Sequence, residues 1–208
     1  MCGRYTLTCP DQETLIRSLP FDEFSETRIR FRPRYNIAPG QSSPVVRLGD
    51  DGPVLADAQW GFTRGGGATV INARSERAAH APLFRDAFRN GRCLVPADGF
   101  FEWRKEGRTN QPYLFRRPDG SLLLMAGLWQ NGCYVVLTCN AQGQVADIHD
   151  RMPVVLGGAA AARQWLDAGK LALSGDLRRI PVSPRINRTE NDDPACLEPI
   201  AQSSFDFD

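Results

Sequence analysis

Several features that often carry function are scarce or missing in this chain of 208 residues. It has only two histidines, His80 and His149, and its six cysteines form no C-x-x-C pair, so it lacks the ligand spacing of a zinc site. We therefore expect no metal and no cofactor. It also has no run of eighteen apolar residues and no basic-then-apolar leader. The sequence thus predicts neither a membrane span nor a secretion signal.

The remaining composition is that of an ordinary globular protein, with 42% hydrophobic and 24% charged residues. A chain of this length fits one domain and can bury a core without disulfide staples. We expect the cysteines to be reduced and the protein to be cytoplasmic.

Lysine is rare, since only Lys105 and Lys170 are found among the 25 basic residues. The forked guanidinium of arginine suits contacts with phosphate, although a GC-rich genome would also favour arginine over lysine. Arginines alternate at 28, 30, 32 and 34, and in an extended chain these four side chains would point one way. A solvated strand face is the simpler interpretation of that run.

Strand patterns outnumber helix patterns along the chain. Helices are predicted after Pro10-Asp11, over 82–90 and over 159–168, and strands near 44–48, 55–60, 93–96, 100–104, 112–117, 121–129 and 133–139. The pattern favours an α+β fold with a mainly antiparallel, barrel-like sheet and a few short helices. We expect one domain over 1–208, with a frayed tail from about residue 200.

Cys2 is the first candidate for chemistry. Once Met1 is removed, this residue would carry a free amine and a thiol on adjacent carbons. Such a 1,2-aminothiol condenses with an aldehyde to a thiazolidine ring, and its thiol can also attack acyl groups. The alternative is a small buried hydrophobic residue.

Two titratable residues could assist that chemistry. Strand alternation places Glu102 on the same face as Phe100, and burial there would raise the glutamate pKa toward neutrality. An exposed glutamate is the alternative. His149 lies close to Asp147 and Asp150, so it could transfer protons or be a turn residue held by either acid.

Four other polar or aromatic residues stand in similar turn or strand contexts. Asn72 could orient a substrate oxygen or cap a turn. Arg74 and Arg151 could bind phosphate or pair with local acids, and Trp103 could stack on a base or fill the core.

Together these segments resemble the SOS response-associated peptidase (SRAP) family of abasic-site shields. The matching stretches run in order along nearly the whole chain, at 1–5, 35–40, 60–62, 71–76, 92–103, 148–153 and 181–183. The chain differs from many relatives in a shorter turn at 130–132 and a shorter tail after Pro199. These departures concern loop contacts rather than the chemical residues.

The resemblance implies a site and a substrate. It assigns chemistry to Cys2, Asn72, Glu102 and His149, and DNA contacts to Arg4, Asn36, Pro39, Arg74, Trp103 and Arg151. The expected partner is single-stranded DNA with abasic sites, including single-strand/double-strand junctions. No membrane partner is expected.

The resemblance also implies an activity in DNA damage repair and the SOS response. The product is a covalent thiazolidine cross-link that protects the abasic site from strand cleavage. Removal of Met1 by the protein itself would be a peptidase (hydrolase) step, and Schiff-base chemistry of the lyase type is a related possibility. We expect a monomer that associates with the nucleoid when bound to DNA. Attack by the thiolate requires a modest lowering of the thiol pKa, which Arg4 or His149 could supply.

Two rival functions fit parts of the sequence. An N-terminal-nucleophile amidohydrolase, such as a glutaminase, would use the Cys2 thiol, with Asn72 and backbone amides as its oxyanion hole. A non-enzymatic DNA-binding module would simply bury Cys2.

Overall fold

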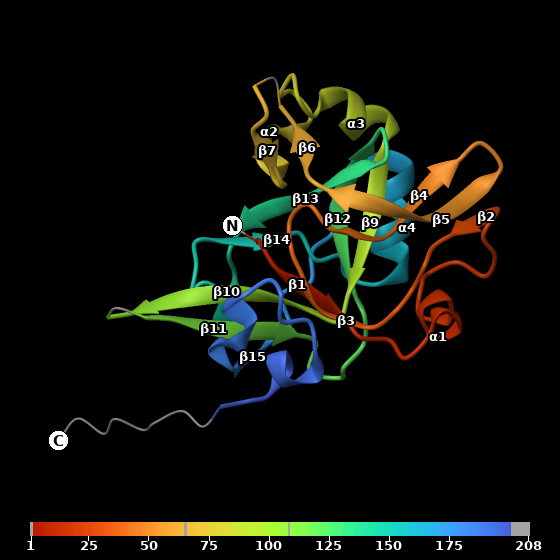
Figure 1. The fold of residues 1–208 in the computed structure, drawn as a ribbon. Helices are drawn as coiled ribbons and strands as arrows, with labels where there is room; N and C mark the ends of the chain where they lie inside the picture. Colours follow the sequence, from red (N-terminus) through yellow and green to blue (C-terminus); the bar gives the residue numbers. More distant parts are fainter. Residues whose placement is uncertain (1, 65, 108, 201–208) are drawn as a thin grey trace.

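The computed structural model describes residues 2–64, 66–107 and 109–200, and strands dominate this part of the chain (Figure 1). Most of the expected frayed tail, from residue 201 onward, lies outside the described residues. No helix of the described ranges is long and apolar enough to cross a membrane.

The elements have the following bounds. The strands are β1 (Tyr5–Leu7), β2 (Glu26–Arg28), β3 (Arg34–Ile37), β4 (Ser42–Gly49), β5 (Gly52–Trp60), β6 (Phe62–Thr63), β7 (Thr69–Val70), β8 (Asn72–Arg74), β9 (Arg92–Ala97), β10 (Gly99–Glu106), β11 (Thr109–Arg116), β12 (Leu123–Gln130), β13 (Cys133–Asn140), β14 (Arg151–Pro153) and β15 (Arg178–Pro181). The α-helices are α1 (Gln12–Arg17), α2 (Ser75–Ala78), α3 (Arg85–Asn90) and α4 (Ala159–Ala168), and the 3-10 helices are η1 (Gly143–Val145), η2 (Pro184–Asn187) and η3 (Pro194–Leu197).

Five strands close into a barrel. The larger sheet runs β13-β12-β9-β4-β5, and a further pairing of β5 with β13 returns to the first strand, with Trp60 opposite Tyr134. That closing pair is parallel, as are β2 with β5 and β8 with β13, whereas the other pairings are antiparallel. The predicted α+β fold with a mainly antiparallel, barrel-like sheet is confirmed.

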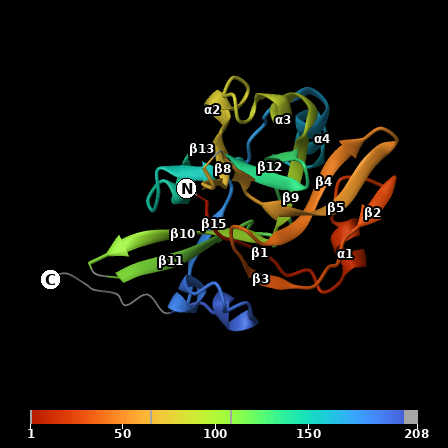
Figure 2. The same ribbon diagram turned by 45° about the horizontal axis from the view of Figure 1, so that its top comes forward.

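A second sheet contains the first strand, β1, as an interior strand. Its order is β15-β11-β10-β1-β3, so β1 pairs with β10 on one side and with β3 on the other. In both ribbon views the described chain starts beside β13 and runs as β1 into this sheet (Figures 1 and 2). The first residues are thereby fixed by strands from two distant parts of the sequence.

The main core joins buried residues of the barrel, of the second sheet and of the helices. Tyr5 from β1 packs edge-on against Trp60 from the barrel at 5.2 Å, and its hydroxyl lies 2.5 Å from that of Tyr134. Phe100 belongs to this core, whereas its neighbour Phe101 belongs to a smaller cluster on the other face of the sheet. The alternation predicted for this strand is therefore confirmed.

The helices follow local signals. Asp11 caps α1 by accepting a hydrogen bond from Thr14 N at 2.8 Å, and α4 ends at Gly169 in the left-handed region with φ 68°. The helix expected from Pro82 begins only at Arg85, and the four residues of α2 were not predicted.

The arginine-rich run is not one strand. β2 ends at Arg28 and pairs with β5 in the larger sheet, whereas β3 begins at Arg34 and pairs with β1 in the second sheet. Pro33, which has no N–H for a ladder, directly precedes β3. The Arg32 side chain is 70% exposed and that of Arg34 only 17%, so the four arginines do not share one solvated face.

Candidate active site

Cys2 lies in the core, next to a buried carboxylate. It has no exposed surface, and the pairing of β1 with β10, continued by the Phe101 N–H to Arg4 carbonyl bond of 3.0 Å, brings it alongside Glu102. Burial raises the pKa of the Cys2 thiol, and the negative charge of Glu102 raises it further. The expected lowering by Arg4 or His149 was wrong, because the apolar surroundings and the nearest acid both disfavour the thiolate. A proton acceptor must therefore assist the thiol.

Glu102 is 2% exposed and shares the core face of β10 with Phe100. Burial raises the pKa of this carboxyl from 4.5 to about 7, and the charge of Asp150 adds to the effect. The burial and raised pKa expected for Glu102 are confirmed. The protonated and the ionised forms of Glu102 are thus both well populated near neutral pH. This suits a group that first donates and then accepts a proton.

Asn72 reaches Cys2 from the barrel. It lies on β8, which pairs in parallel with β13, and its Nδ2 donates to the Cys2 carbonyl at 2.7 Å. That bond fixes the orientation of the amide. Its Oδ1 is buried and accepts no hydrogen bond from any described residue. An unused acceptor therefore lies beside the residue that is expected to react.

His149 lies in the turn between η1 and β14. Its Nδ1 accepts the Arg151 N–H at 2.9 Å, which leaves the proton of the neutral ring on Nε2. The Asp150 carboxylate lies 2.8 Å from the same Nδ1 and can bind it only when that nitrogen is protonated. Burial lowers the pKa of His149 while Asp150 opposes the shift, so the ring is mainly neutral at pH 7. The negative charge of Asp150 therefore raises the pKa of both Glu102 and His149.

Arg151 connects separate segments around the site through its hydrogen bonds. Its side chain is 9% exposed and binds both carboxylate oxygens of Glu76, at 2.8 and 3.0 Å. It also donates to Asn140 Oδ1 at 2.6 Å and to the Thr138 carbonyl at 2.7 Å. These bonds join α2, which follows Asn72, to the turn that carries His149. Both terminal nitrogens are engaged, so a direct DNA contact by Arg151 requires the Glu76 pair to open.

A cavity of about 390 Å³ lies next to the start of β1, lined by Gly3, Arg4, Trp103, Asn110 and Asn187. The Arg4 guanidinium lies 5.9 Å above the Trp103 ring, whose Nε1 donates to Asn187 at 2.6 Å. Both large side chains are only partly buried. An aromatic face and a cation thus border the same space, a combination typical of sites for nucleobases and phosphates.

The other predicted DNA contacts lie in different settings. Pro39 and Arg74 are exposed, whereas Asn36 has no exposed surface. The predicted direct contact of Asn36 with DNA does not fit this burial. Its Oδ1 instead accepts from Arg4 Nη1 at 2.9 Å. Sequence reasoning missed the acid that holds this region, Asp192, for which no local signal exists. Within the described ranges, no group of three side chains could hold a metal ion.

The chain is similar to one protein family over most of its length. A family model described as SOS response associated peptidase (SRAP) matches residues 1–188. The abasic site processing protein YedK of Escherichia coli (strain K12) is 30% identical, with 96% of this chain and 100% of that protein covered. The abasic site processing protein HMCES of Mus musculus is also 30% identical, with 96% and 76% covered.

Solved structures share the fold. A phage-related protein of Bordetella bronchiseptica is 30% identical with a TM-score of 0.70, and the match covers 87% of this chain and 94% of that one. Another protein of the same organism is 25% identical with a TM-score of 0.72, covering 88% and 100%.

Proposed function

Since this chain belongs to the SOS response-associated peptidase (SRAP) family, we propose that it captures abasic sites in single-stranded DNA as a covalent adduct of Cys2. The observation that carries the proposal is the buried carboxyl of Glu102, with a pKa of about 7, beside an N-terminal cysteine. The names of these relatives, which describe abasic site processing, support the same substrate.

The first step is the exposure of the reactive residue. In the full sequence the Cys2 nitrogen is part of the Met1–Cys2 amide and cannot form a Schiff base. Hydrolysis of that bond consumes one water and leaves a free amine beside the thiol. This is the peptidase step, performed by the protein itself or by an aminopeptidase.

The second step opens the sugar. An abasic deoxyribose exists mainly as a ring-closed hemiacetal, and opening it requires a proton on the ring oxygen and loss of the C1′ hydroxyl proton. Protonated Glu102 gives its proton to the ring oxygen and becomes a carboxylate, while a solvent water takes the proton of the C1′ hydroxyl. Neutral His149, through Nε2, can donate a hydrogen bond to the C1′ oxygen as it becomes a carbonyl. The product is an aldehyde at C1′.

The third step closes the adduct. The Cys2 amine attacks C1′ and releases water, and the thiol then adds to the resulting iminium carbon. The thiol proton passes to the Glu102 carboxylate, which compensates for the raised thiol pKa. Ring closure removes the iminium that would drive β-elimination, so the strand stays intact. Asn72 Oδ1, without a hydrogen bond to any described residue, accepts from the free amine or from a sugar hydroxyl.

DNA binding uses the surface around the cavity. Arg4 and the exposed Arg74 bind phosphates, and the half-buried Trp103 stacks on a neighbouring base. Because a site without a base bends at little stacking cost, single strands and junctions are favoured over intact duplex.

The rival amidohydrolase has less support. Its oxyanion hole would need Asn72 Nδ2, and one of the two hydrogens of this group is already donated to the Cys2 carbonyl.

The test mixes purified protein with a single-stranded oligonucleotide that carries one abasic site. A band that survives a denaturing gel, with a mass that includes the protein without Met1, is expected for the wild type and for the control Cys133→Ala, but not for Cys2→Ala. A heat-stable adduct in Cys2→Ala would remove Cys2 from the mechanism. Hydrolysis of glutamine without any DNA adduct would favour the rival.

A further inference from the structure

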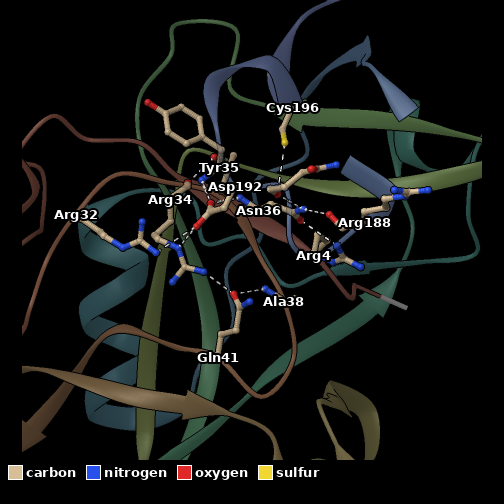
Figure 3. A network of polar contacts seen from close by, with 12 residues as sticks. Arg4, Arg32, Arg34, Tyr35, Asn36, Ala38, Gln41, Arg188, Asp192 and Cys196 are labelled. Atoms are coloured by element: carbon tan, nitrogen blue, oxygen red, sulfur yellow. Dashed lines mark hydrogen bonds and ion pairs between the residues drawn. The ribbon is translucent and has the colours of Figure 1, made fainter. Parts of the chain in front are cut away.

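The C-terminal segment 184–197 holds the outer edge of β3, the last strand of the second sheet. An edge strand leaves backbone N–H groups without ladder partners. Here Asp192 Oδ1 accepts two of them, from Tyr35 at 2.7 Å and from Asn36 at 3.0 Å (Figure 3). Its second oxygen binds Arg34 Nε, and the carboxylate side chain is only 16% exposed.

The same segment also binds the Asn36 side chain. Its Nδ2 donates to the carbonyls of Ile186, Arg188 and Asn191, at 3.3, 2.9 and 2.7 Å. With its donors used in this way, the amide presents only its oxygen toward β1. Figure 3 shows Asn36 between the segment and Arg4.

Arg4 receives its position from this arrangement. Its Nη1 donates to Asn36 Oδ1 at 2.9 Å and to the Ile186 carbonyl at 3.2 Å, and its Nε donates to the Gly3 carbonyl at 3.3 Å. Its Nη2 makes no hydrogen bond to any described residue, so one edge of the guanidinium remains for a ligand. Arg4 lies two residues after Cys2 and lines the cavity described above.

We propose that Asp192 is a positioning residue, which acts through Asn36 to hold the free Nη2 of Arg4 toward a DNA phosphate next to the reacting sugar. We call Asp192, Asn36 and Arg4 the edge clamp. The inference rests on the proposed function, because it names how that site binds its substrate. Asp192 touches neither Cys2 nor the cavity, so it sets affinity for DNA rather than the rate of the bond-forming steps.

The chain offers a matched control. Asp193 is the next residue, and its carboxylate also pairs with an arginine, Arg185 at 2.5 Å, but its hydrogen bonds within the described ranges do not involve β3. Asp192→Asn and Asp193→Asn change the net charge equally, and both remove carboxylate–guanidinium pairing from the same segment. Asp192 pairs with Arg34 and, at 3.6 Å, with Arg32, whereas Asp193 pairs with Arg185. Only Asp192→Asn weakens the hydrogen bonds that hold Tyr35 and Asn36, and with them the edge clamp.

The test measures adduct formation at increasing concentrations of abasic single-stranded DNA. Asp192→Asn should raise the half-saturating DNA concentration about tenfold, in the range for loss of one specific charged contact, and leave the rate at saturation within about threefold. For Asp192→Asn, the negative slope of log affinity against log salt concentration should become shallower by about 0.7, the value for loss of one phosphate contact on a single strand. Asp193→Asn should match the wild type, and Asp192→Asn should add no further loss in an Arg4→Ala background.

Amide hydrogen exchange provides a readout independent of DNA. Exchange at Tyr35 and Asn36 should accelerate in Asp192→Asn and not in Asp193→Asn. Should Asp192→Asn fail to fold, Asp192→Glu, which keeps the charge but displaces it, should show faster exchange and a smaller loss of affinity. Faster exchange with unchanged affinity would overturn the proposal, and so would an equal loss in Asp193→Asn or a full loss in the Arg4→Ala background.

Binding to an intact single strand separates this inference from the proposed function. If the wild type forms no adduct with abasic DNA, the proposed function fails. The clamp is still tested, because Asp192→Asn should weaken binding of unmodified single strands in the same proportion.

Discussion

Replacement of Glu102 by glutamine should make the protein more stable and less reactive at the same time. The carboxyl is buried in the core beside Phe100, where its ionised form is disfavoured. Glutamine has nearly the same shape and carries no charge at any pH. The variant therefore removes a destabilising ionisation together with the proposed proton donor.

The size of the effect follows from the raised pKa. A shift from 4.5 to about 7 corresponds to about 3 kcal/mol, at roughly 1.36 kcal/mol per unit. Between these two pH values the folded chain keeps a proton that the unfolded chain has released. The free energy of unfolding of the wild type therefore falls as the pH rises through this window, and the fall ends above about pH 7. The free energy of unfolding of Glu102→Gln lacks this pH dependence, because glutamine does not ionise.

The assay is urea unfolding of the wild type and Glu102→Gln from pH 4.5 to 8.5. The advantage of the variant should grow by about 3 kcal/mol across the window and then become constant. Glu23→Gln, at an exposed position, serves as the control for the loss of one carboxyl group.

Although Glu102→Gln should be more stable than the wild type, it should form the DNA adduct more slowly. Loss of a general acid lowers a rate by about 10²–10⁴-fold. The wild-type rate should also decline above about pH 7, where Glu102 loses its proton, and the variant should lack that decline. A stability difference that is independent of pH, or that shrinks as the pH rises, would refute the assignment of a buried, readily protonated carboxyl.

Three further predictions address the surroundings of the site. Arg151→Met should destabilise the protein by about 2–4 kcal/mol in urea unfolding, because it leaves buried acceptors unpaired, and a loss below 1 kcal/mol would contradict the structural tie to Glu76. Trp103→Ala should weaken binding of single-stranded DNA by about 1–3 kcal/mol in fluorescence titrations while Trp103→Phe retains most of it, and equal losses would argue against stacking. Asp11→Ala should lower the midpoint of thermal unfolding through loss of the α1 cap, with no change in DNA binding.

Local patterns predicted much of the fold. The period of two in β10 correctly placed Phe100 and Glu102 on the core face, and Phe101 and Trp103 on the other. Helix α4 has the predicted bounds, because glycines flank it on both sides. Signals of this kind lie within a few residues of the structure that they specify.

Features that depend on distant segments could not be predicted in the same way. The pairing of Trp60 with Tyr134, which closes the barrel, joins residues with no shared local pattern. Asp192 resembles any other loop acid until β3 is placed beside it. The direction of the Cys2 pKa shift was wrong for the same reason, since it depends on which neighbours the fold delivers.

The position of β1 between β10 and β3 determines when the proposed removal of Met1 can take place. Cys2 becomes enclosed only when β1 pairs with β10, and β10 begins roughly 95 residues later in the chain. At about 5–20 residues per second, translation leaves an interval on the order of 5–20 s before that strand exists. Under the proposed function, an aminopeptidase that acts within this interval reaches Cys2 before β10 covers it, whereas a later cleavage requires access to a residue with no exposed surface.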